Sequence, residues 1–265
     1  MRPSEHLCLF LNNFFPKRQR AGRESPEAYS QAQHAWAVKS YAFYADMISL
    51  EGKTVLDAGC GPGGKTLYYA GKGCRKIIGA DIDENRIAHA RNFLAQQHAP
   101  NVEFVVADLS RMPFEDDSFD VIFLNDVFEH IERPILSKVL AECKRVIKPS
   151  GSICMEFPPW TSFDASHLYD HIYIPWCQNI FSERTLVNVL NHMQVGRPVV
   201  GKLSVVDHFL ELNRITIGES RRLFEEHGFK ILRFEQIMLK QIRAFRKLPV
   251  LHAYLTRRVV AILSK

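Results

Sequence analysis

A glycine-rich segment, Gly59-Cys60-Gly61-Pro62-Gly63-Gly64, follows a short apolar run at residues 54–58. A strand that ends in glycines and then opens a helix places backbone N–H groups and the positive helix end beside an anionic ligand group. The spacing Gly59-x-Gly61-x-x-Gly64 also matches the dinucleotide-binding fingerprint, with Asp81 about 20 residues further along. The loop therefore predicts a nucleotide-like cofactor.

Acidic residues around this loop discriminate between kinds of cofactor. Asp57 lies two residues before the first glycine, and Asp108 follows the third expected strand. A carboxylate at Asp57 would repel the pyrophosphate of a dinucleotide, but it would attract a ligand that carries an ammonium or sulfonium group. The sequence therefore favours a cationic ligand, and an NAD(P)-dependent oxidoreductase that uses the same loop is the first alternative.

Three histidines are candidates for proton transfer. His130 follows the fourth expected strand, and His167 and His171 lie in the segment expected to cover the site. If residues 167–173 are helical, the spacing of four places both imidazoles on one helix face, with Asp170 beside one of them. Because imidazole exchanges protons near neutral pH, His130, His167 and His171 are the predicted catalytic residues.

The chain alternates between strand-like and helix-like segments. A helix is expected from Ser25-Pro26 to Leu50, and a later one over 219–227. Short β-branched runs predict strands at 54–58, 76–80, 102–106, 121–124, 152–157, 229–238 and 258–263. This alternation predicts a doubly wound α/β fold with a parallel sheet covered on both faces, and residues 258–263 are expected to pair antiparallel inside the sheet.

The regular alternation is lost over residues 158–217, which are rich in aromatic residues, histidine and proline. We therefore expect four regions. They are a basic N-terminal extension (1–25), a cofactor-binding core (26–157), an inserted acceptor-binding lid (158–217), and a C-terminal helix and β-hairpin that complete the core (218–265).

Several segments together resemble the class I S-adenosylmethionine-dependent methyltransferases. Residues 55–64 are similar to the first motif of that family, and Gly79-Ala80-Asp81-Ile82-Asp83 is similar to the second. Ala107-Asp108-Leu109, residues 124–131 and residues 147–152 continue the resemblance in the same order. The resemblance implies a Rossmann-like sheet of seven mostly parallel strands, with an antiparallel last strand and an inserted lid after strand five.

The resemblance also implies a cofactor, S-adenosylmethionine, and in-line transfer of its methyl group to a small or lipid-like acceptor. It places the methionine moiety against Asp57, Gly59, Cys60, Gly61 and Gly63, the ribose against Asp81, the adenine against Ile82, Asp108 and Leu109, and the sulfonium over Asn125 and Asp126. A catalytically silent cofactor-binding partner subunit is the second alternative, because methyl transfer needs no fixed catalytic residue.

Asp126-x-x-Glu129-His130 resembles an acid-x-x-Glu-His metal cluster of some class I methyltransferases, in which a later histidine completes the site. The first position of the pattern is Asp in this chain, where those proteins have Glu. We therefore predict no metal, and we interpret the segment as helix termination and packing.

Composition and charge limit the remaining function classes. The 265 residues are 46% hydrophobic and 24% charged, as in ordinary globular proteins. We recognise no apolar run of membrane-spanning length and no secretion signal, and the six cysteines show neither disulfide nor zinc spacing. A cytoplasmic protein is therefore expected.

Positive charge is concentrated at the two ends of the sequence. Residues 1–23 carry five Lys or Arg and one acid, and residues 236–265 carry seven and no acid. Such ends permit peripheral contact with anionic lipid, but no nucleic-acid partner is expected because neither end interleaves aromatic and basic residues.

Overall fold

The computed structural model describes residues 1–17, 25–195, 204–239 and 249–265. Parts of the expected N-terminal extension (18–24), of the expected lid (196–203) and of the basic C-terminal stretch (240–248) lie outside the described residues.

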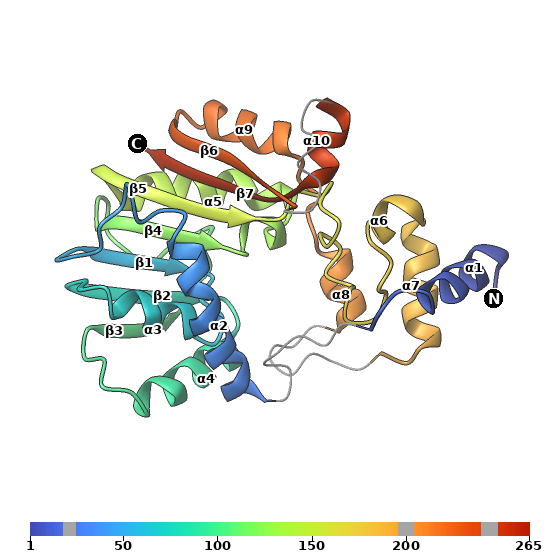
Figure 1. The fold of residues 1–265 in the computed structure, drawn as a ribbon. Coiled ribbons are helices and arrows are strands. Elements are labelled where there is room, and N and C mark those ends of the chain that lie inside the picture. Colours follow the sequence, from blue (N-terminus) through green and yellow to red (C-terminus); the bar gives the residue numbers. More distant parts are fainter. Residues whose placement is uncertain (18–24, 196–203, 240–248) are drawn as a thin grey trace.

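Seven strands form a single sheet in the order β3-β2-β1-β4-β5-β7-β6 (Figure 1). The strands are β1 (Thr54–Ala58), β2 (Lys76–Asp81), β3 (Val102–Val106), β4 (Phe119–Asn125), β5 (Ile147–Phe157), β6 (Lys230–Met238) and β7 (Thr256–Ser264). Strands β1 to β5 pair in parallel, and β7 pairs antiparallel with both β5 and β6. The predicted fold class and the predicted antiparallel strand inside the sheet are both confirmed.

Helices cover both faces of the sheet. The helices of this α/β core are α2 (Pro26–Tyr41), α3 (Gly64–Ala70), α4 (Glu84–Ala95), α5 (Arg133–Val146) and α9 (Ile217–Glu226). Side chains of α5 and α9 join the larger apolar cluster on one face, and side chains of α2 and α3 join a second cluster on the other. Because both faces are buried, the central strands consist of nearly continuous apolar residues.

Helix α2 ends earlier than predicted. Its start agrees with the sequence, since Ser25 Oγ accepts a hydrogen bond from the Ala28 N–H. The helix ends at Tyr41, however, and turns replace the helix expected as far as Leu50. Arg233 of β6 donates to the Phe43 carbonyl and pairs with Asp46, so a contact with a distant strand holds these turns.

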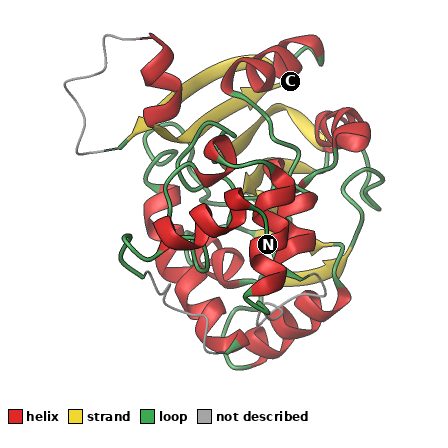
Figure 2. Ribbon diagram, turned by 90° about the vertical axis from the view of Figure 1, so that its right-hand side faces the viewer, coloured by secondary structure: helices red, strands yellow, loops and turns green. Residues whose placement is uncertain are grey.

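The described parts of 158–217, which are 158–195 and 204–217, form helices with a small apolar core of their own, and the N-terminal helix packs into that core. The helices are α1 (Pro3–Asn12), α6 (Cys177–Ile180), α7 (Glu183–His192) and α8 (Val205–Leu210). Cys8 of α1 is buried among Leu186 and Val189 of α7 and Phe209 of α8. Figure 2 shows these helices and the N-terminus in front of the sheet. We call residues 158–217 the insertion.

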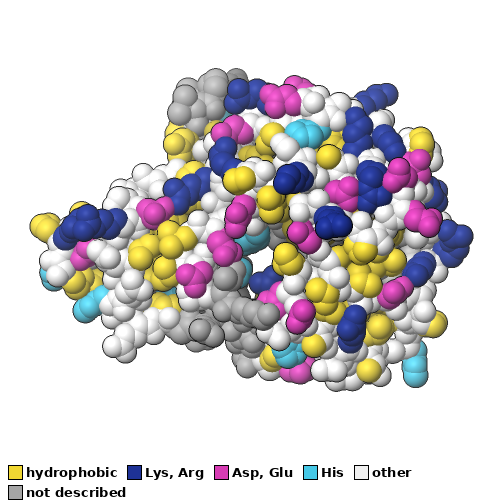
Figure 3. Space-filling view, turned by 180° about the vertical axis from the view of Figure 1, so that it is seen from behind, with side chains coloured by type: hydrophobic (Ala, Val, Ile, Leu, Met, Phe, Trp, Pro, Cys, Tyr) yellow, Lys and Arg dark blue, Asp and Glu magenta, His cyan; other side chains and the backbone are white. Residues whose placement is uncertain are grey.

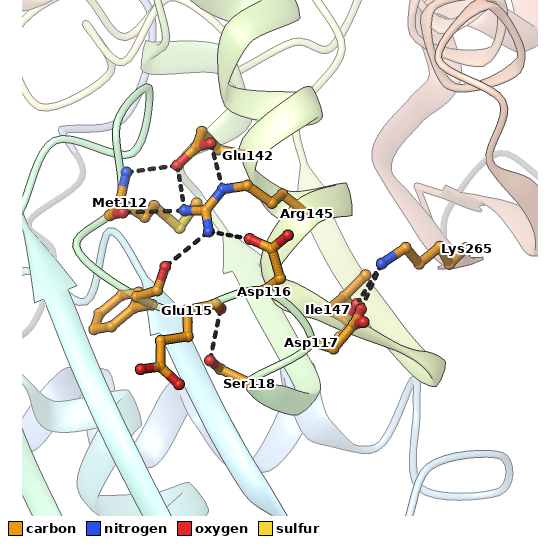
Figure 4. Close-up of polar contacts among 10 residues, drawn as sticks. Met112, Glu115, Asp116, Asp117, Ser118, Glu142, Arg145, Ile147 and Lys265 are labelled. Atoms are coloured by element: carbon orange, nitrogen blue, oxygen red, sulfur yellow. Dashed lines mark hydrogen bonds and ion pairs between the residues drawn. The ribbon is translucent and has the colours of Figure 1, made fainter.

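The chain after β3 is fastened to α5 by one arginine. Arg145 donates to the carbonyls of Met112 and Phe114, and it pairs with Glu142 and Asp116 (Figure 4). Such multiple charge-assisted hydrogen bonds fix a loop more firmly than a single contact does. They hold the loop that begins at Asp108, which is the residue expected at the adenine.

Two further expectations concern helices and cysteines. Among the described residues no helix combines the length and the apolar character needed to cross a membrane. All six cysteines are buried thiols, as the sequence predicts.

Strands β6 and β7 pair as implied for the C-terminal hairpin, but helix α10 (Pro249–Leu255) lies in the connection between them.

Candidate active site

The glycine loop follows β1 directly and has little freedom in its shape. Gly59 has φ = +76°, and a Cβ at this position would lie 2.5 Å from the Val127 side chain. Both constraints exclude larger residues. The Gly61 N–H donates to Asp81 Oδ2 at 2.9 Å, and the Gly64 N–H donates to Gln33 Oε1 at 3.2 Å. The loop is therefore held between β2 and α2.

Three carboxylates lie at the carboxyl ends of neighbouring strands, as predicted. Asp57 of β1 is buried and accepts a hydrogen bond from Thr66 Oγ1 at 2.6 Å. Burial raises the pKa of Asp57 to about 6, although the Thr66 hydrogen bond opposes this shift. Asp81 ends β2, and exposed Asp108 follows β3. The structure thus brings these acids to one edge of the sheet.

Apolar side chains next to these acids are open to solvent. Ile82 is 69% exposed beside Asp81, and Leu109 is half-buried beside Asp108. Cys60, in contrast, is buried against Phe104 and Ile87. An exposed isoleucine at the open edge of a sheet is suited to contact a flat apolar ring.

The end of β4 carries a network of charged and amide groups. The Asn125 side chain accepts from Tyr44 Oη at 2.7 Å and donates to Tyr69 Oη at 2.9 Å. Asp126 pairs with Lys65 Nζ at 2.7 Å and with Arg258 Nη1 at 3.0 Å. Although burial opposes ionisation, these two cations hold the pKa of Asp126 well below its usual range. Both side chains are therefore already engaged within the protein.

A buried carboxylate and two imidazoles meet just after β4. Glu129 lies in the short 3₁₀ turn η1 (Phe128–His130) and is 3% exposed. Its Oε1 lies 4.0 Å from His130 Nε2 and 3.8 Å from His167 Nε2. Burial and nearby Asp126 raise the pKa of Glu129 to about 8, while burial and His167 hold the pKa of His130 well below its ordinary value.

The cluster of Glu129, His130 and His167 lies at the boundary between the insertion and the α/β core, which we also call the sheet domain. His167 belongs to the insertion, and the other two residues follow β4. The carboxyl ends of the parallel strands face the insertion in Figure 1. Seen from behind, the surface is hollowed between these two parts, with histidine side chains at the edge of the hollow (Figure 3). This hollow is the candidate place for an acceptor.

The prediction that His167 and His171 share a helix face is wrong. None of residues 167–173 is helical, a turn covers 169–171, and His167 has φ = +57°, which interrupts any helix. The Ser166 hydroxyl accepts from the Leu168 N–H and so supports the turn. The His171 carbonyl accepts a hydrogen bond from the Asn12 side chain of α1. Among the described residues, the group of potential metal-ligating side chains includes His167 but not His171.

Sequence reasoning missed Lys65, Arg258 and Gln33. Lys65 is a buried cation in the first turn of α3, and its position directly after the glycines was the available signal. Arg258 reaches Asp126 from β7, and Gln33 reaches the loop from α2. Nothing in the local sequence around Arg258 or Gln33 signals those contacts.

Comparison with known proteins gives the same assignment as the motifs. A family model described as "Methyltransferase domain" matches residues 55–151. A probable S-adenosylmethionine-dependent methyltransferase of Mycobacterium tuberculosis is 34% identical over 112 residues, which are 42% of this chain and 38% of that protein. Residues 55–151 therefore form a class I S-adenosylmethionine-dependent methyltransferase domain. The cofactor of this domain is S-adenosylmethionine.

Other curated relatives of the methyltransferase domain include small-molecule enzymes. The chloroplastic tocopherol O-methyltransferase of Arabidopsis thaliana is 33% identical over 132 residues, or 49% of this chain and 36% of that protein. The chain spans less than half the length of the curated relatives it matches.

Solved structures resemble the methyltransferase domain in fold. An S-adenosylmethionine-dependent methyltransferase of Methanosarcina mazei has a TM-score of 0.58 at 22% identity, covering 85% of this chain and 97% of that one. A Pyrococcus horikoshii OT3 protein also has a TM-score of 0.58 at 20% identity, covering 88% and 91%. These matches show a shared fold.

Proposed function

We propose that this protein transfers a methyl group from S-adenosylmethionine to a small or lipid-like acceptor bound between the sheet edge and the insertion. The observation that carries the proposal is the placement of Asp57, Asp81 and Asp108 at adjacent strand ends, next to the polar cluster that follows β4. Methyl transfer is an in-line displacement, so a scaffold that orients donor and acceptor supplies most of the rate.

In this proposal each part of the cofactor has its own contacts. Asp57 attracts the methionine ammonium, and the backbone of Gly59, Cys60, Gly61 and Gly63 lies against the methionine moiety. Each carboxylate oxygen of Asp81 accepts one backbone hydrogen bond, from Gly61 or from Asp83, and retains a lone pair for a ribose hydroxyl. Ile82, Asp108 and Leu109 surround the adenine. The backbone at Asn125 and Asp126 forms the floor below the sulfonium.

On the acceptor side, two of the three predicted histidines lie near the proposed acceptor site. His130 and His167 lie beside Glu129 at the boundary with the insertion, whereas His171 belongs to a turn that contacts α1. The aromatic residues of the insertion pack against one another, as Trp160 does on Phe209, and so support its helices. Relatives named tocopherol O-methyltransferase, sterol 24-C-methyltransferase and phosphoethanolamine N-methyltransferase support a small or lipid-like acceptor.

Calorimetric titration tests the cofactor half of the proposal. S-adenosylhomocysteine should bind with a stoichiometry of one, and NAD should give no heat of binding. Radiolabelled S-adenosylmethionine with a panel of hydroxylated and amine-bearing lipids and small molecules then tests transfer. Absence of S-adenosylhomocysteine binding would refute the proposal, and binding without transfer to any panel member would favour a silent cofactor-binding subunit.

A further inference from the structure

The Glu129 carboxyl group is buried, with 3% exposed, and both of its oxygens are without a hydrogen-bond partner in the described part of the chain. Buried carboxylates in folded proteins are almost always paired, hydrogen-bonded or bound to a metal, because removing such a group from water costs several kcal/mol. An unpartnered carboxylate in the interior therefore indicates a ligand.

The atoms nearest this carboxylate are metal-ligating nitrogens. His130 Nε2 and His167 Nε2 lie 4.0 and 3.8 Å from Glu129 Oε1, and the three donor atoms lie within 4.8 Å of one another. Around a tetrahedral ion with bonds of about 2.0–2.1 Å, neighbouring donor atoms are separated by about 3.4 Å. Small side-chain rotations would bring these donors to that separation.

We propose that Glu129, His130 and His167 bind a divalent first-row transition-metal ion at the boundary between the sheet domain and the insertion. Two imidazole nitrogens and one carboxylate oxygen suit ions such as Zn²⁺, Co²⁺ or Mn²⁺, whereas Mg²⁺ and Ca²⁺ prefer oxygen ligands. Three protein donors leave at least one coordination position open, as in metal sites that bind an exogenous ligand.

This ligand set differs from the one that the sequence pattern suggests. Asp126 is paired with Lys65 and Arg258, so its carboxylate is already neutralised. His167 of the insertion corresponds to the later histidine of the pattern, whose position the pattern does not fix. Glu156 also has a cation beside it, since its Oε1 lies 3.8 Å from Arg258 Nε.

The backbone that carries two of the ligands is held firmly. The Asn213 N–H donates to the Glu129 carbonyl at 2.9 Å, and Asn213 Nδ2 donates to the carbonyls of Phe128 and Ile131. These hydrogen bonds from Asn213, near the end of the insertion, therefore fix the position of the η1 backbone. Such outer contacts are what orient the ligands of a metal site.

The open position has a consequence that rests on the proposed function. An ion held here stabilises the anionic form of an oxygen bound to it and so lowers the pKa of that oxygen. The acceptor class that fits is therefore one whose methylated or neighbouring group is an ionisable hydroxyl.

The test measures metal binding directly, without any acceptor. Chelator-treated full-length protein is titrated with Zn²⁺ by calorimetry and with Co²⁺ by visible absorption. The wild type should bind one equivalent and give the intense visible bands of a tetrahedral or five-coordinate Co²⁺ site. Glu129→Gln and His167→Ala should each weaken binding at least 100-fold, while His192→Ala, which removes an exposed imidazole on α7, should bind as the wild type does.

Thermal unfolding separates a metal ligand from a structural residue. Without metal, Glu129→Gln should melt close to the temperature of the wild type, because an amide of the same size replaces a carboxyl group that has no hydrogen-bond partner to lose among the described residues. One equivalent of Zn²⁺ should raise the melting temperature of the wild type but not that of the variant. Absence of one-equivalent binding, or unchanged binding by both variants, would overturn the metal site.

The same samples distinguish this failure from failure of the proposed function. S-adenosylhomocysteine should bind the chelated wild type and Glu129→Gln alike, because no cofactor contact passes through Glu129. Loss of S-adenosylhomocysteine binding by the chelated wild type would count against the methyltransferase proposal and not against the metal site.

Discussion

Asp81 serves the fold and the proposed cofactor site at the same time. Its two oxygens accept backbone hydrogen bonds from Gly61 and Asp83, so the carboxylate shapes the loop that it faces. Replacement by alanine would therefore disturb the loop as well as the ribose contact. Asparagine keeps the size of the side chain and one acceptor oxygen, and so it is the more informative substitution.

We expect Asp81→Asn to weaken S-adenosylhomocysteine binding by about 1.5–3 kcal/mol, roughly 10- to 150-fold, because hydrogen bonds to a charged group have this strength. Calorimetric titration provides the measurement. Glu84→Gln is the matched control, since it removes a carboxylate from the exposed start of α4 without altering these contacts. Equal affinities for Asp81→Asn and wild type would show that Asp81 does not hold the ribose.

Asp57 predicts a pH dependence of cofactor binding. Burial raises its pKa to about 6, so the native cofactor-free protein holds this proton more tightly than the unfolded chain does. Its contribution to stability is therefore full at acidic pH and is lost as the pH rises through about 6. The methionine ammonium favours the ionised form, so binding should release this proton.

Affinity for S-adenosylhomocysteine should therefore fall as the pH is lowered below about 6, approaching tenfold per pH unit. Titrations between pH 5 and 8 measure this slope, and buffers of different ionisation enthalpy report the released proton. Asp57→Asn should flatten the profile. A wild-type profile that is already flat across pH 6 would contradict the role assigned to Asp57.

At this scale, local sequence predicted some contacts and not others. Asp57, Asp81 and Asp108 could be placed because each lies at or just after the end of a strand, and the ends of parallel strands share one edge. Lys65, Arg258 and His167 could not, since their partners depend on where β7 and the insertion lie in space. His167 and His171 show the same limit, because a residue with positive φ breaks the helical spacing on which that prediction depended.

At the scale of elements, α2 supports the glycine loop through close backbone contact. A Cβ on Gly64 would lie 2.0 Å from the Ser30 carbonyl oxygen, and the Ser30 hydroxyl donates to the Pro62 carbonyl. The first turn of α3 and the first half of α2 can approach this closely only because residue 64 lacks a side chain.

Gly64→Ala should push α2 away from the loop and destabilise the protein by about 1–3 kcal/mol, the usual cost of overpacking. Differential scanning calorimetry should show a fall of about 2–4 °C per kcal/mol. Gly71→Ala, at the other end of α3, adds a Cβ whose nearest neighbour is 3.5 Å away and should have little effect. Similar melting temperatures for the two variants would argue against the close approach.

The order of elements was largely predictable, and their lengths were less so. Strands β1 and β3 have the predicted bounds; β1 is followed by the turn residue Gly59, and β3 begins after a turn at residues 100–101. Helix α2 ends nine residues before the predicted Leu50, since Arg233 of distant β6 stabilises the turns instead. The insertion has too few regular patterns for its helices to be recognised from sequence.

At the scale of the whole molecule, the N-terminal helix and the insertion share one core. Asn12 of α1 is buried, donates to the His171 carbonyl and accepts from the Tyr173 N–H. Glu5 of the same helix accepts from Asn188 of α7. Segments that are far apart in the sequence therefore depend on each other for hydrogen bonds.

Asn12→Ala would remove hydrogen bonds from the His171 carbonyl and the Tyr173 N–H, which are both part-buried, at a total cost of about 1–3 kcal/mol. Urea unfolding should show this loss of stability, and limited proteolysis should show faster cleavage within 158–195. Asn13→Ala, at the exposed neighbouring position, should behave as the wild type. Unchanged proteolysis of Asn12→Ala would show that α1 does not support the insertion.

Strand β7 has a consequence for the order in which the protein can be completed during synthesis. It lies between β5 and β6, and residues 259–263 are fully buried, yet it follows the other six strands of the described sheet in sequence. While a ribosome is still translating, β5 therefore remains an unpaired edge with apolar side chains, the kind of edge that invites association with other chains. The nascent protein becomes safe from such association only after residue 264 has left the exit tunnel.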